Sequence, residues 1–565
     1  MKHLYIYSLI IACLFFSCEK SLDLKPLDRF SESNYFKNAE QFKLFCNQFY
    51  NNFPTANSAL QRDLYSDLFV DWSTNSISNG SYSAPTSNSI WNNSYAIIRN
   101  TCYLIERAEE SSENLKSEIS VYVGEANYFR AVAYFDLLKD FGGVPLIEKV
   151  LDVTDVDELY KGRATREEIV IAILKYLDTA IEFLPLEKDI SKEDKGRVSK
   201  EAALSMKARV CLFEGTWQKF RGKEFKSLLE KAVASSKEVI DGNYYKLFDR
   251  RDVLGDQSYK YFFILDKVKS NVANLTKADQ NEYILANRFD TEIRPANVVS
   301  SHRYPSVTKK FADMFLCDDG LPIDKSKNFK GRTTVTSEYE NRDLRMTSVL
   351  QLPFTKYWAH FPPEYSRDFN NPDDGGNNYT VNFDNTSQTG YFATKFRPEI
   401  REPYSPDFPV IRFAEVLLIY AEAKFEIEER ISDEDLDLSI NKLRRRAGLP
   451  VLSNSFVQIN RLDMRTEIRR ERTIELFLEG FRFDDLRRWK TAEIEMPQAL
   501  KGVLWKDTQY ETDPQWSSVH FQQDEDGFII IESASKRKFE EKHYLFPIPT
   551  RQIILNSNLE QNPGW

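Results

Sequence analysis

Helical patterns fill residues 409–490, and they constrain the fold more than any other part of the chain. In the first of three pieces, an apolar arc repeats at helical spacing through Ile411, Ala414, Leu418, Ala421 and Phe425. An arc of this width indicates a helix buried on much of its circumference, and its alanines allow a neighbouring helix to approach closely. The last piece carries a stripe of Ile474, Phe477, Leu478 and Phe481. This stretch predicts a unit of three packed helices and not a catalytic motif.

Further helices are predicted in the first half of the chain, at residues 38–53, 97–110, 119–141, 165–184, 199–214 and 225–240. The fourth begins with Thr165, and Glu168 follows three residues later, which is a capping box. Most of these helices come in neighbouring pairs with alanines at the expected contacts. The arrangement resembles tetratricopeptide-like helix pairs, although the chain has no clean 34-residue repeat.

Residues 254–408 have a different texture, with short helical stripes and frequent Asn, Asp, Gly, Pro and aromatic residues. One short helix is expected at 306–315, and strands and loops elsewhere. We therefore expect a helical part at 38–250, an irregular insertion at 251–408, a second helical part at 409–490 and a closing segment at 491–565. The predicted fold class is mainly α, with helix pairs and a portion rich in loops and short strands packed on one side.

The N-terminus resembles an export signal. Leu4–Phe16 is apolar except for Ser8, which suits a signal-peptide core and is too short to span a bilayer. The apolar run stops at Ser17 and Cys18, as in a bacterial lipobox, so we expect a signal peptide at 1–17, a lipid on Cys18 and a tether at 18–37. Cys13 also fits locally, but cleavage there would leave apolar residues at the new N-terminus. The alternative is an ordinary secretory signal peptide in which Cys18 carries no lipid.

Composition excludes several classes of function. The formal net charge is −10, which argues against nucleic acid as a partner. The basic run Arg444–Arg446 is expected to form one solvated helix face. The cysteines form no CxxC pair and the five histidines are scattered, so no metal or cofactor is predicted. Cys46, Cys102 and Cys211 lie in apolar helical patterns and are expected in the core.

Many short motifs, in the right order from Cys18 to Trp565, resemble the SusD/RagB family of lipoproteins. They are Phe129-Arg130-Ala131, Phe141-Gly142-Gly143-Val144-Pro145, Gly196-Arg197-Val198, Arg412-Phe413-Ala414-Glu415-Val416, Glu471-Arg472 with Glu475-Leu476, Asp485-Leu486-Arg487-Arg488-Trp489, Tyr544-Leu545-Phe546-Pro547-Ile548-Pro549, and Gln561-Asn562-Pro563-Gly564. The resemblance implies four tetratricopeptide-like helix pairs with the rest of the chain on one side. It also implies a surface lipoprotein of the outer membrane that captures a nutrient, usually a glycan, and lids a SusC-like TonB-dependent transporter.

Sugar chemistry singles out a few candidate contact residues, because sugars offer apolar C–H faces to flat rings and hydroxyl edges to amides, carboxylates or arginine. The first candidates are Trp72, Asn75 and Tyr82, on a long polar loop that corresponds to a ligand-facing loop of the family. Packing of Trp72 onto the helices is the competing interpretation. Arg288 and Phe289 lie in a second family ligand region, and Trp358 in an aromatic cluster is a third candidate.

Two other functions stay open at this point. A peptide-binding role in the manner of RagB fits the same resemblance. A surface glycosidase would need two carboxylates facing each other across a cleft, and no catalytic arrangement is recognisable in the sequence. We therefore expect a non-catalytic glycan-binding protein.

Overall fold

The computed structural model describes residues 35–267, 270–296, 306–357, 377–378, 381, 383, 387–397 and 404–565. Lipid attachment at Cys18 and ligand contact by Trp358 concern residues that lie outside these ranges.

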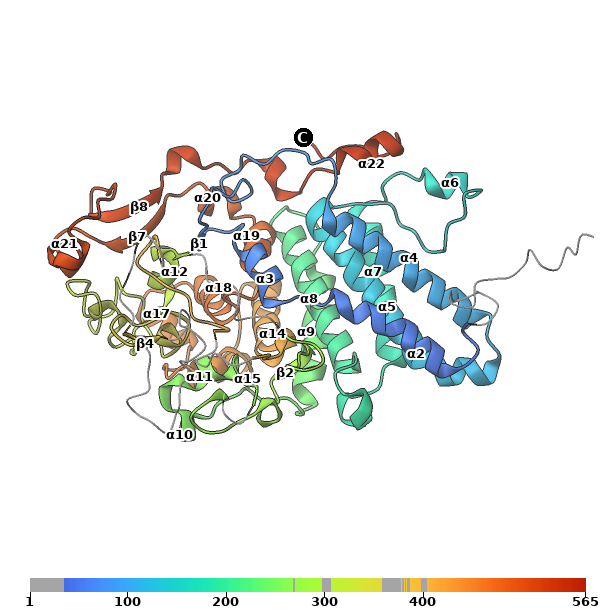
Figure 1. Cartoon of the computed structure of the whole chain (residues 1–565), viewed down its shortest axis with the longest axis horizontal. Helices are drawn as coiled ribbons and strands as arrows, with labels where there is room; N and C mark the ends of the chain where they lie inside the picture. The colour runs from blue at the N-terminus through green and yellow to red at the C-terminus, as the bar shows by residue number, and fades with distance from the viewer. Residues whose placement is uncertain are drawn as a thin grey trace, which may run out of the picture.

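Long helices form one side of the molecule and irregular chain the other (Figure 1). Neighbours pack in the order α4, α5, α7, α8, α9, α14 and α18. Their bounds are α4 Ser89–Glu109, α5 Glu113–Phe141, α7 Arg166–Phe183, α8 Lys200–Lys219, α9 Lys226–Asp241, α14 Phe413–Glu428 and α18 Met464–Glu475. The helices predicted in the first half of the chain are all present, the first of them as α2 Ala39–Asn47, and the mainly α fold class is confirmed.

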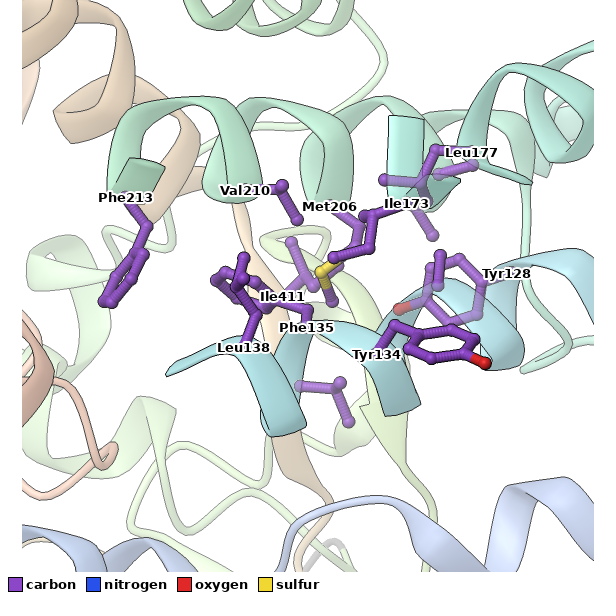
Figure 2. Close-up of a cluster of buried hydrophobic side chains, with 14 of the residues drawn as sticks. Tyr128, Tyr134, Phe135, Leu138, Ile173, Leu177, Met206, Val210, Phe213 and Ile411 are labelled. Carbon is purple, nitrogen blue, oxygen red and sulfur yellow. The ribbon is translucent and has the colours of Figure 1, made fainter. Parts of the chain in front are cut away.

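The core between these helices is built from interleaved apolar side chains (Figure 2). Phe135 of α5 meets Phe213 of α8 edge to face, with 5.5 Å between ring centroids. Ile173 comes from α7, and Ile411 reaches the same cluster from the opposite half of the chain. Cys46, Cys102 and Cys211 are buried, as predicted. Burial of this kind stabilises a fold by about 25 cal/mol per Å² of apolar surface.

Local signals fix where the helices begin. The Thr165 hydroxyl accepts from the Glu168 amide at 3.2 Å, and the Glu168 carboxylate accepts from the Thr165 amide at 2.7 Å. The predicted capping box is therefore confirmed, and such a cap is worth about 1 kcal/mol.

Shorter helices connect and cover these long helices, which together are called the helical array below. They are α2 Ala39–Asn47, α3 Ala56–Asp63, α6 Val156–Leu159, α10 Arg251–Leu254, α11 Ser258–Phe262, α12 Lys309–Met314, α13 Arg345–Val349, α15 Asp433–Leu438, α16 Ile440–Arg446, α17 Asn454–Ile459, α19 Arg482–Arg488, α20 Ala492–Glu495, α21 Gln509–Thr512 and α22 Thr550–Leu555. Within the described ranges, no helix has the length and hydropathy needed to cross a membrane.

The strands of the described residues form four antiparallel pairs and no larger sheet. The pairs are β1 Phe69–Val70 with β3 Ser306–Val307, β2 Tyr283–Asn287 with β6 Phe408–Arg412, β4 Lys356–Tyr357 with β5 Asn377–Asn378, and β7 Leu500–Leu504 with β8 Phe528–Glu532. The pairs β1–β3 and β2–β6 join segments that are distant in sequence.

Three boundaries differ from the sequence prediction. Residues 408–412 form strand β6, so helix α14 begins at Phe413 and Ile411 lies on the strand. The stretch 306–315 starts as strand β3 and becomes helix α12 only at Lys309. The last predicted helix is broken in two, because Leu478 and Gly480 have positive φ angles of 61° and 83° and turn the chain between α18 and α19.

The prediction of a solvated basic face at Arg444–Arg446 is wrong for two of its three residues. Arg444 and Arg446 are buried, and only Arg445 is exposed. Arg446 donates to Glu282 at 2.8 Å and to Glu475 at 2.5 Å. The buried guanidinium is stable there because carboxylates from two distant segments surround it.

Glu475 of α18 is the centre of this buried ion network. Its carboxylate accepts from Arg345 at 2.9 Å, Arg412 at 2.6 Å and Arg446 at 2.5 Å. Burial raises the pKa of Glu475, but the three arginines outweigh burial and hold it well below its usual range. The network thus connects the irregular half of the molecule, residues 251–408, to the second helical part. Arg345 of α13 and Arg412 of strand β6 make the contacts with Glu475.

Candidate functional site

The loop between β1 and α4 carries three of the predicted contact residues. Strand β1 pairs with β3 through Phe69–Val307 and Val70–Ser306, and Trp72 follows two residues after the strand. Trp72 is half-buried. Its amide donates to the Asp71 carboxylate at 2.7 Å, which fixes the backbone where the loop leaves the strand.

Asn75 shapes the loop by closing a turn. Its side-chain oxygen accepts from the amides of Ile77 and Ser78, both at 3.1 Å. Asn side chains commonly fold back on the backbone in this way. The oxygen of Asn75 therefore has a structural role in the loop, in addition to the ligand contact predicted from the sequence.

Residues 537–538, near the C-terminus, form hydrogen bonds with the same loop. Arg537 donates to the Ser78 carbonyl at 3.1 Å, and the Lys538 amide donates to the Asn79 carbonyl at 3.0 Å. Gly80 has a φ of +77°, and a Cβ there would lie 2.1 Å from the Lys538 carbonyl oxygen. Only glycine permits this close approach. The loop is therefore held in one conformation, which reduces the entropic cost of binding a ligand.

Tyr82 packs against the chain's last residues. Its ring lies 5.7 Å from Phe546 and 5.9 Å from Trp565, between ring centroids. Burial raises the pKa of the Tyr82 hydroxyl, and the ring is half-buried. Tyr82 thus joins the loop to the tail, and only its half-exposed part can contact a ligand.

Arg288 and Phe289 follow strand β2 at a different place in the fold. Arg288 donates to the Lys195 carbonyl at 2.7 Å, and more than half of its side chain is exposed. The Phe289 amide donates to Asp407 at 2.9 Å, and Arg294 lies 5.1 Å from the centre of the Phe289 ring. These contacts hold the pair beside the helical array while leaving Arg288 accessible to solvent.

Trp72, Asn75 and Tyr82 lie on one loop, and Arg288 and Phe289 lie at a different place in the fold. Figure 1 shows β1 and β2, which the two groups follow, in separate parts of the irregular half. Ligand contact by each of these residues stays a prediction. In the described part of the chain, no cluster of three or more His, Cys, Asp or Glu side chains is suited to hold a metal ion.

The residues that hold the loop could not be found from the sequence. Arg537 lies 459 residues from Ser78, and neither residue is part of a sequence motif that predicts the contact. The only local signal was Gly80, a glycine within a polar loop.

Comparison with known proteins decides the family. The model described as "SusD family" matches residues 274–565, which is about half of the chain, and one described as "Starch-binding associating with outer membrane" matches residues 22–212. The chain belongs to the SusD family. The resemblance in the sequence motifs is therefore confirmed.

Similar proteins support this family over nearly the whole chain. "SusD-like protein P38" of Formosa agariphila is 24% identical over 520 residues, covering 86% of this chain and 91% of the relative. A SusD-like protein from Bacteroides fragilis has a similar fold, with a TM-score of 0.72 and 24% identity, covering 96% of this chain and all of that one. A second B. fragilis structure, described as a SusD-like carbohydrate binding protein, has a TM-score of 0.71 and 20% identity, covering 93% and 99%.

Proposed function

We propose that this SusD-family chain is a non-catalytic outer-membrane lipoprotein that binds a nutrient glycan and delivers it to a SusC-like TonB-dependent transporter. The observation that carries the proposal is a half-buried tryptophan, Trp72, on a loop held rigid within a SusD fold. Pre-formed loops with flat rings suit the stacking of sugar faces.

The comparisons support the glycan as the ligand class. One structural neighbour is described as a carbohydrate binding protein, and another as surface glycan-binding protein A from Bacteroides fluxus, with a TM-score of 0.58. The family model for the N-terminal part is described as starch-binding and associating with the outer membrane. A lipid on Cys18 would supply that association, because two or three buried acyl chains anchor a protein cumulatively. Mass spectrometry of protein isolated from bacterial membranes tests this anchor. An unmodified Cys18 would contradict it.

Truncating Trp72 tests the site. Trp72→Ala is expected to weaken glycan binding at this loop about tenfold or more, since truncating a tryptophan that is a binding hot spot costs about 2 kcal/mol or more. The measurement is the retardation of the purified protein in native gels that contain polysaccharides. Tyr160→Ala, which removes an exposed aromatic ring from α6's C-terminal end, is the control and should leave retardation unchanged.

Two outcomes would contradict the proposal. Equal retardation of wild type and Trp72→Ala would exclude Trp72 as a ligand contact. Failure of every polysaccharide to retard the wild type, together with peptides recovered from it by mass spectrometry, would favour a peptide-binding role.

A further inference from the structure

A groove with a volume of about 540 Å³ is lined by long helices of the array and by residues from segments 51–62, 408–410 and 479–488. Its walls come from the loop 51–55, helices α3, α4, α5, α8, α14, α18 and α19, strand β6 and the turn between α18 and α19. None of the predicted contact residues lines it. Its volume falls within the range of about 300–1,000 Å³ that is typical of small-molecule sites.

Two helices turn a face into this groove. Helix α4 contributes Ile90, Asn93 and Ile97, which are spaced three and four residues apart. Helix α5 contributes Val132, Asp136 and Lys139, with spacings of four and three. All six are half-buried or exposed, whereas Leu138 on the inner side of α5 is buried in the core shown in Figure 2. These faces are therefore accessible to a ligand, although Ile90, Ile97 and Val132 also pack against the core with part of their surface.

The turn between α18 and α19 adds an aromatic ring to the groove. Phe481 is half-buried there, and the guanidinium groups of Arg209 and Arg472 lie 5.3 and 5.2 Å from its ring centre. Glu415 holds Arg209 in place with contacts of 2.6 and 2.7 Å. The groove thus combines a flat ring with planar hydrogen-bonding groups, the chemistry that sugars require.

The charges of the lining residues cancel. Five are basic, Arg62, Lys139, Arg209, Arg472 and Arg488, and five are acidic, Asp136, Asp140, Glu479, Asp484 and Asp485. Many already pair with one another, as Arg62 does with Asp140 at 2.6 Å and with Asp484 at 2.5 Å. A charged ligand would lose its hydration without gaining a net counter-charge. A neutral ligand with many hydroxyl groups can instead bond to the paired charges and to the amides of Asn51, Asn52 and Asn93.

We propose that this groove is a second binding site, which holds a short segment of a neutral oligosaccharide. The inference rests on the proposed glycan function, but it uses residues different from those of the Trp72 loop. The apolar side chains of Ile97, Val132 and Phe481 would contact the C–H faces of the sugar, and the amides and paired charges its hydroxyl groups.

Filling the groove tests this proposal. Val132→Trp places a large ring in the groove and removes no polar group, so calorimetric titration with a neutral oligosaccharide that binds the wild type should show one site in place of two. Trp72→Ala should remove the other site, and the double variant should bind at neither. Ile171→Trp, at an exposed position of the array helix α7, is the matched control and should keep both sites.

Each remaining outcome decides the matter. If Val132→Trp does not fold, as judged by its thermal unfolding, Asn93→Trp fills the groove from α4 at an exposed position and should have the same effect. The proposal of a groove site would be overturned if a folded groove variant kept two intact sites. It would also be overturned if the wild type had only one site and Trp72→Ala abolished it. Both outcomes would leave the proposed function standing. No binding of any neutral oligosaccharide by the wild type would overturn the groove, and no binding of any glycan at all would overturn the proposed function as well.

Discussion

Glu475→Ala is expected to destabilise the protein by about 3–5 kcal/mol, the typical cost of breaking a buried ion pair from one side. Glu475 is fully buried, and its carboxylate is the shared acceptor for Arg345, Arg412 and Arg446. Without it, three buried guanidinium groups lose their common counter-charge. Since a domain is typically stable by only about 5–15 kcal/mol, this loss should lower the urea concentration at the unfolding midpoint markedly.

Urea unfolding followed by circular dichroism measures this effect. Glu434→Ala, at an exposed position of α15, is the control and should unfold at the wild-type midpoint. If Glu475→Ala unfolded at the same urea concentration as the wild type, the network would contribute little to stability, and the arginines would have found other partners.

Acid is expected to destabilise the protein steeply between pH 5 and pH 3. Burial raises the pKa of Glu422, but Arg488, Arg472 and Trp489 outweigh burial and lower it from 4.5 to about 2. A carboxyl group with a lowered pKa stabilises the fold above its unfolded pKa, and this contribution is lost as the pH falls through the folded pKa. A shift of this size corresponds to roughly 3 kcal/mol for Glu422 alone.

Other buried carboxylates add to the acid effect. The pKa values of Asp67, Glu475 and Asp484 are also lowered, because burial is outweighed by neighbouring arginines and lysines. Asp63 acts in the opposite sense: burial raises its pKa from 3.8 to about 7, so its contribution falls as the pH rises from 4 to 7. Urea midpoints should therefore be compared at pH 5 and pH 3, an interval that leaves out the larger part of the Asp63 change, which falls between pH 5 and pH 7. Equal midpoints at these two values would contradict the account of the buried ion pairs.

The helical array could be predicted from the sequence because its signals are local. Stripes of apolar residues and the Thr165 cap depend on neighbours within four positions, and these predictions are confirmed. The break between α18 and α19 was missed because the apolar stripe continues through it, whereas the positive φ of Leu478 is set by tertiary packing.

Residues whose role depends on distant partners could not be predicted. Arg446 looked like a solvated surface residue, but its partner Glu282 lies 164 positions away. The groove draws its walls from residues 51 to 488, and no single segment shows its pattern. The candidate loop was found through Trp72 and its family resemblance, whereas the contacts that hold it came only from the structure.

One measurement tests the central claim, that this SusD-family chain binds glycans without transforming them. Purified wild-type protein is titrated calorimetrically with a panel of defined oligosaccharides, and each mixture is then analysed by chromatography for shortened chains. We predict saturable binding of at least one class of glycan and recovery of that glycan at its original length. Shortened products, or a panel in which no glycan binds while peptides co-purify with the protein, would contradict the account.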